Sequence, residues 1–350
     1  KGNLLPGFLS YLVFVGWETV LVSLATLATG TILDRLGTLG RNASLSLGFL
    51  IAVSLTVFGG VLGYRVIMAM QRWISLITLI ATGLFMALTL NTINWSALTS
   101  MKSGNIEGLI GAIVFAMTGI GLGWVNSAAD YSRYLPRDVR SSSVVGWTVF
   151  GASIAPIIMV IYGAALAGSS KELSDSVAAD PIGALTTLLP KWYLIPFALV
   201  AILGLIGGSI LDLYSSGIAL VSIGLPVKRH IAASIDGGIM TIGTIYIVWI
   251  AKNFFGPFQN FLIALGVPIA VWSAMFVADV LTRKNYNESA LFDKTGEYGS
   301  WNFKSITLLV LGSIVGWSFV SKTIGNIGII FGLIIGFIGQ IILSKKKPRK

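Results

Sequence analysis

The sequence predicts an all-α integral membrane protein that crosses the bilayer ten times. Of its 350 residues, 55% are hydrophobic and 11% are charged, and the mean hydropathy is +0.86. A water-soluble chain of this size would carry more charge on its surface. Apolar runs of about 18 residues or more also recur along the whole chain, and a helix of that length crosses a hydrocarbon core of about 30 Å.

The apolar segments lack the alternation of polar and apolar residues that strands of a membrane barrel show, so helices are favoured. We expect the ten spans at 6–33, 44–64, 73–91, 108–129, 144–167, 193–222, 234–251, 258–281, 304–321 and 324–344. Most connections between them are short. The longer connection 168–190 has a Ser/Asp-rich first half and an apolar second half, which fits a surface or re-entrant helix on the outside.

Positive charge predicts the orientation in the membrane. If residue 1 lies in the cytoplasm, 17 of the 24 Lys and Arg residues fall in inside segments and 7 fall outside. By the positive-inside rule, both termini of this chain are cytoplasmic and the protein is a multi-pass protein of the plasma (inner) membrane. The net charge of +10, including the basic tail 345–350, then reflects topology and contact with membrane lipid, not nucleic-acid binding.

The sequence lacks the residues that several kinds of chemistry need. The chain has no Cys and a single His, His230, which argues against disulfides, a thiolate nucleophile and a Cys/His zinc site. It has no GxxxxGK[ST] loop for ATP-driven transport and no paired nucleophile and base. We therefore expect no enzyme, metal or cofactor, while a structural or receptor role stays open.

Two acidic residues lie well inside predicted spans, where an ionised carboxylate costs about 2.5–3.5 kcal/mol or more. Glu18 lies near the middle of the first span, and Asp212 lies two-thirds along the sixth. Trp17, Glu18 and Leu21 share an arc of about 100° on a helix, so an aromatic plate and a carboxylate can border one cavity. A planar heterocycle would suit such a pair, although core packing explains Trp17 equally well.

Three further acidic residues, Asp130, Asp236 and Asp279, lie near the predicted cytoplasmic ends of their spans. There, interfacial water lowers the cost of a charge. Pairing with a nearby Arg or Lys and a functional role are both consistent with these positions.

A polar stripe runs along the predicted sixth membrane helix. Ser209, Asp212 and Ser216 fall at i, i+3 and i+7, so they share one face that must avoid lipid. The stripe fits a substrate or proton site, and it also fits a hydrogen-bond network between helices. The pair Gly207-Gly208 before it would allow local unwinding or a close backbone approach.

The stretch "MTGIGLGWVNSAADYSRYLPRD" combines glycines with charge. Gly119, Gly121 and Gly123 each weaken a helix by about 1 kcal/mol relative to Ala, and glycine-interrupted spans in transporters mark discontinuous helices. Trp124 follows the predicted break, near the bilayer centre.

Beyond this break, Asp130 and Arg133 are spaced i, i+3, and Pro136 is expected to stop the helix. From the pattern alone, this pair is either an interfacial ion pair or part of a functional inner gate.

Four stretches resemble the nucleobase–cation symporter family, which comprises permeases for cytosine, purines, uracil, allantoin and hydantoins. "AADYSRYLP" resembles the signature at the end of the family's sixth helix, and "LYSSGIALVSIGLPVKR" resembles its eighth-helix signature. "GNLLPGFLSYLVFVGWETV" is similar to the third helix, and "VFGGVLGYRVIMAMQRW" to the fourth helix and the loop after it. The resemblance covers essentially the whole chain.

The resemblance implies a fold of two inverted five-helix repeats plus two accessory helices, of the amino acid–polyamine–cation superfamily type. The ten spans match family helices three to twelve, so helices one and two are expected to be missing and the chain to be a fragment. A single transporter domain would then comprise 1–91 as the remainder of the first repeat, 108–281 as the second repeat, 304–344 as the accessory helices and 345–350 as the tail.

The resemblance also implies site residues. Trp17 matches the third-helix aromatic that stacks on substrate, and Trp124 matches a sixth-helix counterpart, with Gly121 as a rival contact. Asp212 stands where many members have a substrate-binding Asn, and Leu21 replaces a Gln that some members have. The expected substrate-binding residues are Trp17, Glu18, Gly121, Trp124, Asn126 and Asp212, with Asp130 and Arg133 as the gate.

The expected coupling ion follows from two positions at which this chain differs from sodium-coupled members of the family. Sodium-coupled members carry a Ser/Thr pair about six residues before the eighth-helix Asn, and here Ile206 and Gly207 stand in those positions. We therefore expect proton coupling through Glu18 and Asp212 with Ser209.

The predicted function is import of a nucleobase or related heterocycle by cation symport with alternating access. Two alternatives remain. One is an amino-acid or amine transporter of the same superfold, and the other is a truncated membrane protein that cannot transport.

Overall fold

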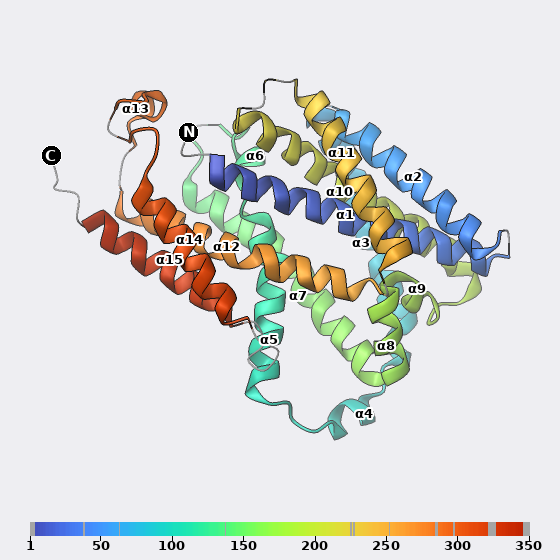
Figure 1. Cartoon of the computed structure of the whole chain (residues 1–350). Coiled ribbons are helices and arrows are strands. Elements are labelled where there is room, and N and C mark those ends of the chain that lie inside the picture. Colours follow the sequence, from blue (N-terminus) through green and yellow to red (C-terminus); the bar gives the residue numbers. More distant parts are fainter. Residues whose placement is uncertain are drawn as a thin grey trace. The chain divides into compact units, whose positions relative to one another are not determined.

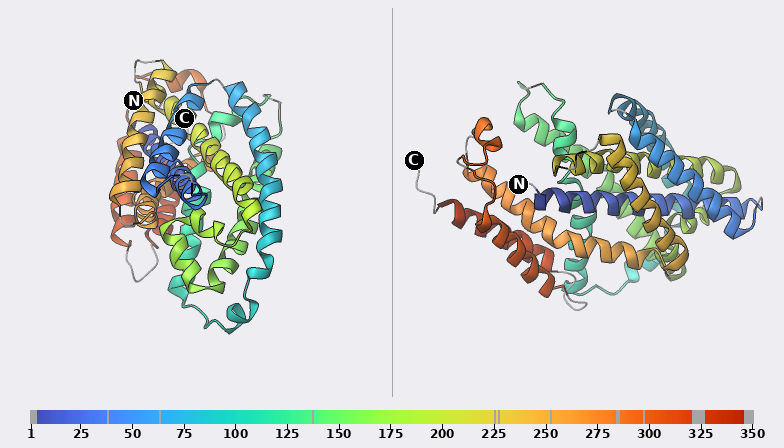
Figure 2. Two further views of the ribbon diagram at one scale, coloured as in Figure 1. Left: turned by 90° about the vertical axis from the view of Figure 1, so that its right-hand side faces the viewer. Right: turned by 45° about the horizontal axis from the view of Figure 1, so that its top comes forward.

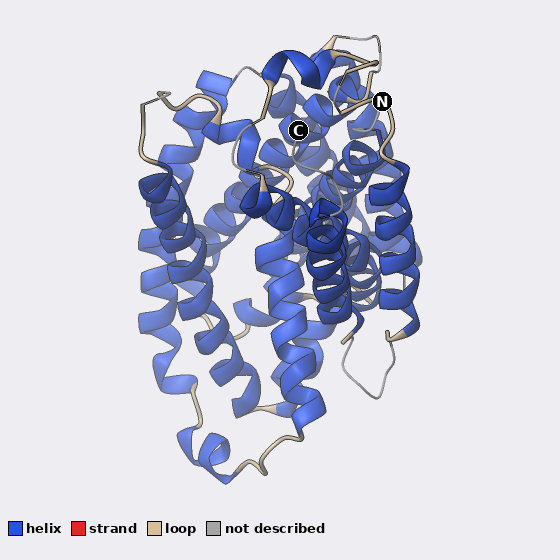
Figure 3. Ribbon diagram, turned by 90° about the vertical axis from the view of Figure 1, so that its left-hand side faces the viewer, coloured by secondary structure: helices blue, strands red, loops and turns tan. Residues whose placement is uncertain are grey.

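The computed structural model describes residues 4–37, 39–62, 64–136, 138–224, 226, 228–251, 253–283, 286–296, 298–320 and 327–345. Residue 1, most of the basic tail (346–350) and the first residues of the expected span 324–344 lie outside the described residues. The described residues form helices and loops, with no strand (Figure 3).

The helices follow one another along the chain as labelled in Figure 1. They are α1 Leu4–Arg35, α2 Arg41–Val61, α3 Tyr64–Thr89, α4 Trp95–Ser100, α5 Ile106–Ala116, a π-helical segment Met117–Leu122, α6 Ala128–Ser132, α7 Ser141–Ser169, α8 Lys171–Ala179, α9 Pro181–Thr186, α10 Lys191–Ser222, α11 Arg229–Ile245, a second π-helical segment Tyr246–Ile250, α12 Phe255–Thr282, α13 Glu288–Phe292, α14 Phe303–Ser318 and α15 Gly328–Lys345. A short 3-10 helix, Leu90–Thr92, follows α3.

Seven of the described helices are long and apolar enough to cross a membrane. They contain α1, α2, α3, α7, α10, α11 and α12, and they match seven of the predicted spans. The remaining predicted spans, 108–129, 304–321 and 324–344, correspond to the shorter apolar helices Ile106–Leu122, Phe303–Ser318 and Gly328–Ser344. The all-α membrane fold is confirmed, and the count of ten spans stays a prediction.

The connection 168–190 is helical, as its composition predicts, and contains α8 and α9. Asp180 joins the two helices and caps α9, because its Oδ1 accepts from the Gly183 N–H at 2.9 Å. The other oxygen, Oδ2, accepts from Thr31 Oγ1 at 2.6 Å. This connection is therefore fastened to the C-terminal part of α1.

The chain divides into two compact units, each described separately. The first consists of Lys1–Val13, Ser103–Val144 and Gln259–Lys350, and the second of Phe14–Lys102 and Val145–Phe258. Helices α1, α7 and α12 each contribute residues to both units.

In the second unit, α10 packs against α2, α3 and α11, and the views in Figure 2 show these helices side by side. Val22, Ile67, Ile206, Ile210 and Met240 form a buried cluster at their centre. Lipid is as apolar as these side chains, so close packing, more than water exclusion, holds such helices together.

Two glycines of α11 show how close this packing is. A Cβ at Gly237 would lie 2.8 Å from Val57 Cγ2 of α2, and one at Gly243 would lie 2.7 Å from Thr19 Cγ2 of α1. Only glycine allows α11 to approach both helices so closely.

In the first unit, α14 and α15 pack against each other. Val271 and Met275 of α12 form a buried cluster with Leu309 of α14, and Leu5 and Leu9 from the start of α1 pack against it. The unit is thus built from segments at both ends of the chain.

Candidate functional site

Glu18 lies inside the second unit and is fully buried, with 0% of its surface exposed. Hydroxyl residues follow it along α1, and Thr19 and Ser23 donate to carbonyls of their own helix. The side chain of Glu18 is within hydrogen-bonding reach of Asp236 on α11, and Asp212 and Ser216 of α10 also act on it. Three acidic residues from three helices therefore meet within one unit.

For Asp236, the sequence left open an interfacial ion pair or a functional role, and it did not predict a contact with Glu18. Its expected place was near an exposed helix end, but the structure buries it completely beside Glu18. The physical reason is the close approach of α11, which Gly237 and Gly243 permit. The small residues of "AASIDGG" were the available signal, because small residues mark contacts between membrane helices.

The polar stripe of α10 divides into two environments. Ser209 is fully buried and shares a 2.7 Å hydrogen bond with Thr56 Oγ1 of α2. Ser216 is also buried and donates to the Leu213 carbonyl at 3.0 Å, while Asp212 between them is partly exposed. Ser209 thus takes part in a bond between helices, and Asp212 is the least buried member of the stripe.

The expectation of local unwinding at Gly207-Gly208 is wrong, because α10 continues as a helix from Lys191 to Ser222. Gly207 instead accepts a hydrogen bond from Gln71 Nε2 of α3. A Cβ at Gly208 would lie 3.0 Å from Leu21 Cδ1. The structure instead shows the alternative expectation for this glycine pair, which is a close approach of neighbouring helices.

Trp17 lies next to Glu18 in sequence but in different surroundings. It is partly exposed and meets Phe258 edge to face, with ring centroids 5.7 Å apart. Phe258 in turn stacks on Phe254 at 5.6 Å. Because the Glu18 oxygens are sealed from solvent, the expected shared wall of one cavity is not seen. The ring of Trp17 packs on Phe258, while the carboxyl group of Glu18 faces α10 and α11.

At the predicted helix break, the first unit has a π-helical segment, and the turn follows only after Trp124. Helix α5 ends at Ala116, a π-helical segment occupies Met117–Leu122, and a turn leads to α6 at Ala128. Gly121 is exposed with nothing within 4 Å of a Cβ built on it, and Trp124 is 51% exposed. Both lie at the interruption and are accessible.

Asn126 lies in the turn after the break. Its Oδ1 accepts from Ser10 Oγ of α1 at 3.1 Å. Its Nδ2 is buried and has no hydrogen-bond partner among the described residues. A buried donor without a partner costs about 1–3 kcal/mol, so this amide is suited to bind an acceptor.

Helix α6 ends at Ser132, and turns continue to Leu135, whose N–H donates to the Ser132 carbonyl at 3.0 Å. This agrees with the expected stop at Pro136, which has no N–H to continue the helix. Arg133 lies just beyond α6, where its guanidinium donates to Tyr134 Oη at 3.0 Å and lies 5.0 Å from the centre of that ring. Asp130 is partly buried within α6. A gate formed by Asp130 and Arg133 stays a prediction.

The site residues are thus found in two groups. Trp17, Glu18, Ser209 and Asp212 belong to the second unit, and Gly121, Trp124, Asn126, Asp130 and Arg133 belong to the first. Within the described part of the chain, no three His, Asp or Glu side chains are grouped so that they could hold a metal ion.

Comparison with known proteins gives one consistent result. Residues 1–340 match the family of permeases for cytosine/purines, uracil, thiamine and allantoin. The chain is 23% identical to the protein named "Putative purine-cytosine permease YxlA" of Bacillus subtilis (strain 168), over 100% of this chain and 77% of that protein.

Two solved structures share the fold. One is Mhp1, a nucleobase–cation symport-1 family transporter, in a closed conformation with bromovinylhydantoin bound, with a TM-score of 0.67 and 17% identity over 99% of this chain and 77% of that chain. The other is the inward-facing conformation of Mhp1, with a TM-score of 0.68 and 16% identity over 99% and 74% of the two chains. The chain is therefore a multi-pass membrane transporter that belongs to the permease family for cytosine/purines, uracil, thiamine and allantoin.

Proposed function

We propose that the protein imports a nucleobase or a related heterocycle, such as cytosine, a purine, uracil or allantoin, by cation symport with alternating access. The observation that carries this proposal is the interrupted helix, which places exposed Trp124 two residues from Asn126 and its unused buried donor. Stacking on an aromatic face and hydrogen bonding at a ring edge are the two contacts that a planar heterocycle needs. The names of the related proteins support the same substrate class.

In this proposal, each substrate contact is assigned from the chemistry of the protein group that would make it. Trp17 and Trp124 offer aromatic faces. The Gly121 backbone and the Asn126 amide offer hydrogen-bonding groups, and Asp212 is an accessible acceptor for ring N–H groups. In this proposal Glu18 acts on the substrate only through Asp212, because its own oxygens are sealed within the helix packing.

The coupling ion in this proposal is the proton. Two ionised carboxylates side by side in a buried site repel each other strongly, so Glu18 and Asp236 form a stable contact only when they share a proton. Asp212 connects this pair to the accessible face of α10, and Ser209 holds α10 against α2. The Ile206 side chain is packed in the apolar cluster, so it offers no ligand for sodium.

The proposal also gives the protein an orientation. The excess of Lys and Arg in the predicted inside segments favours cytoplasmic termini and insertion in the plasma (inner) membrane. Asp130 and Arg133 would then lie at the cytoplasmic end of the interrupted helix, where they would form the inner gate.

Ligand binding to the purified protein tests the substrate class. Thermal unfolding in detergent is measured with cytosine, uracil, a purine, allantoin and a set of amino acids. We expect a rise in Tm with at least one heterocycle and none with amino acids, because a ligand that binds only the folded state stabilises it. Stabilisation by amino acids alone would instead support an amine or amino-acid transporter of the same superfold.

A variant pair makes the assay specific to the site. Trp124→Ala removes the proposed aromatic face and is expected to abolish the rise in Tm. Trp147→Ala removes an aromatic that is 74% exposed on α7, outside the proposed site, and is expected to leave the rise unchanged. Equal loss of the ligand response in both variants would contradict the assigned site.

A further inference from the structure

A groove of about 270 Å³ lies within the first unit, at the C-terminal end of α12. Its walls come from the start of α1 and from α12, α14 and α15. The residues that carry the argument are Trp272, Phe276, Asp279, Arg283, Asn302 and Gln340. None of them belongs to the proposed transport site.

The groove changes from apolar to charged along α12. Trp272, Phe276, Asp279 and Arg283 are spaced by four, three and four residues, so they lie on one helical face. The first two stack on each other, with ring centroids 6.0 Å apart, and the last two form an ion pair with Nε and Oδ2 3.4 Å apart. Aromatic and then charged side chains at the end of a membrane helix match the boundary between acyl chains and headgroups.

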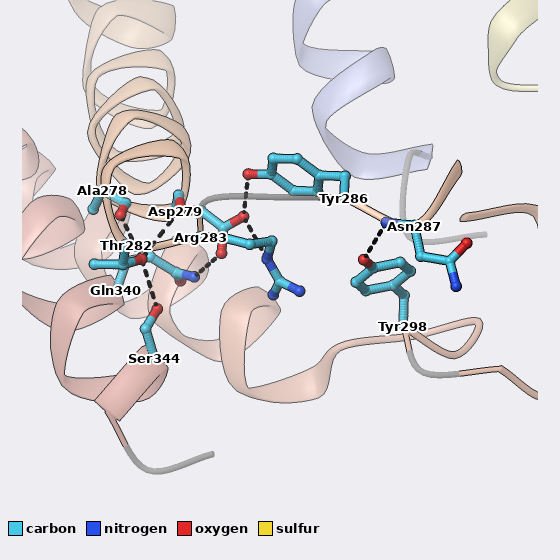
Figure 4. Close-up of polar contacts among 9 residues, drawn as sticks. All are labelled: Ala278, Asp279, Thr282, Arg283, Tyr286, Asn287, Tyr298, Gln340 and Ser344. Atoms are coloured by element: carbon cyan, nitrogen blue, oxygen red, sulfur yellow. Dashed lines mark hydrogen bonds and ion pairs between the residues drawn. The ribbon is translucent and has the colours of Figure 1, made fainter. Parts of the chain in front are cut away.

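The charged end is held in a hydrogen-bond network (Figure 4). Asp279 accepts from Tyr286 Oη at 2.8 Å and from Gln340 Nε2 at 3.1 Å, in addition to its contact with Arg283. The Arg283 guanidinium lies 5.4 Å from the ring of Tyr286 and 5.1 Å from the ring of Tyr298. Burial and the bond to Asp279 raise the pKa of Tyr286 to about 12, so its hydroxyl remains a donor. The network fixes Arg283 while leaving 26% of its side chain exposed.

Gln340 supplies an unused acceptor at the same place. Only 9% of this residue is exposed, and its orientation is set because Nε2 donates to Asp279. Its Oε1 is buried and accepts no hydrogen bond from any described residue. An N–H donor brought beside Asp279 would satisfy this oxygen, and a cationic N–H group would suit the neighbouring carboxylate best.

We propose that this groove binds one phospholipid whose headgroup carries both a phosphate and a primary ammonium, as in phosphatidylethanolamine. The Arg283 guanidinium binds the phosphate, the ammonium lies near Asp279 and Gln340 Oε1, and the acyl chains lie along Trp272 and Phe276. Among its described lining residues the groove presents one cation and one anion, so a zwitterion complements it, whereas an anionic headgroup alone would leave Asp279 without an added cationic partner. A choline headgroup has the same charges but no N–H to donate.

The test measures lipid binding to the full chain in detergent, by native mass spectrometry and by thermal unfolding. The added lipids are phosphatidylethanolamine, phosphatidylcholine and phosphatidylglycerol with identical acyl chains. We expect phosphatidylethanolamine to bind most tightly and to raise Tm most. Equal effects of the ethanolamine and choline lipids, or a preference for the glycerol lipid, would overturn the proposal.

Two substitutions test whether the lipid binds in this groove. Arg283→Gln removes the phosphate contact, and we expect roughly tenfold weaker binding of phosphatidylethanolamine. Gln340→Met removes the acceptor without a change of charge, and we expect it to abolish the preference for ethanolamine over choline. Because Gln340→Met is neutral and similar in size, it keeps the test decisive if Arg283→Gln does not fold.

Lys294→Gln is the matched control, because it removes a positive charge from an exposed residue of the same connection, outside the groove. It is expected to bind all three lipids like the unaltered protein. Loss of binding in this control as well as in Arg283→Gln would show a general charge effect and overturn the proposal. Formation of a lipid-free dimer that is lost in Arg283→Gln would assign the groove to a second copy of the chain instead.

Discussion

Acidic residues lie in two contrasting environments in this protein. Glu18 and Asp236 in the second unit are completely buried and lie against each other. Asp279 in the first unit has a side chain that is 24% exposed, and it receives Arg283, Tyr286 and Gln340 as partners. A carboxylate with three donors is stable as an anion, whereas two carboxyl groups that face each other need a proton.

The difference shows which acidic residues are suited to change their charge during a transport cycle. Asp279 is held in place by its three partners, so it can organise a surface. In the proposed coupling, the buried pair shares one proton and responds to its presence.

The largest effect is expected from the buried pair. Glu18→Gln and Asp236→Asn each remove one member of the proton-sharing pair while keeping its shape. We expect the uptake driven by an imposed pH gradient to fall by about 5-fold to 150-fold, which is the usual range of coupling between two ligands. The uptake that remains should no longer depend on the gradient. Uptake is measured in cells with and without the gradient.

Asp175→Asn is the control for this experiment, because Asp175 is an exposed acidic residue on α8. It should transport like the unaltered protein. Uptake that depends on sodium and is insensitive to pH would contradict the assigned role of Glu18 and Asp236.

The packing that brings the pair together gives the next effect. Gly243→Ala places a methyl group 2.7 Å from Thr19 Cγ2, and Thr19 has a branched, stiff side chain. We expect a loss of about 1–3 kcal/mol in stability, the usual cost of overpacking, seen as a lower Tm.

Gly238→Ala is the matched variant on the same helix, where the added Cβ meets nothing within 4 Å. It should be neutral, or stabilising by up to about 1 kcal/mol, because Ala favours a helix more than Gly. Equal destabilisation by both substitutions would show that close approach of α11 to α1 is not what Gly243 provides.

A smaller effect is expected at Asp279, the acidic residue that has an arginine partner. Asp279→Asn leaves Arg283 without its counter-ion and replaces charged acceptors with a neutral one. Because both side chains are about a quarter exposed, water compensates part of the loss, and we expect a decrease of about 1 kcal/mol in stability. Thermal unfolding in detergent measures it, and an unchanged Tm would show that the network contributes no net stability.

The smallest effect concerns an exposed acidic residue. The backbone N–H and the hydroxyl of Thr295 donate to Asp293 and hold the pKa of that carboxyl below its usual range. A depressed folded-state pKa contributes stability above the unfolded-state value of about 3.9, and this contribution is lost as pH falls through the folded-state pKa. Asp293→Asn should therefore lower Tm only slightly at pH 7, and the difference from the unaltered protein should vanish in strong acid.

The sequence predicted features that depend on local composition. Long apolar runs predicted ten spans, and seven of them match described helices that are long and apolar enough to cross a membrane. The three glycines between 119 and 123 predicted a weakened helix there, where the structure has a π-helical segment. Motifs such as "AADYSRYLP" were sufficient to identify the family.

Other local signals were overruled by packing. Gly207 and Gly208 lie within a continuous α10, because contacts with Gln71 and Leu21 outweigh a helix penalty of about 1 kcal/mol for each glycine. A propensity of this size is a weak constraint when neighbouring helices fix the backbone.

Hydropathy and short motifs are properties of consecutive residues, so they were enough to predict a helical membrane transporter of the permease family. The contact of Asp236 with Glu18, two acids more than 200 positions apart, and the convergence of Arg283, Tyr286 and Gln340 on Asp279 came from the folded arrangement of the helices. The charge that a buried acid can carry depends on the residues that surround it in space, and those residues come from separate helices.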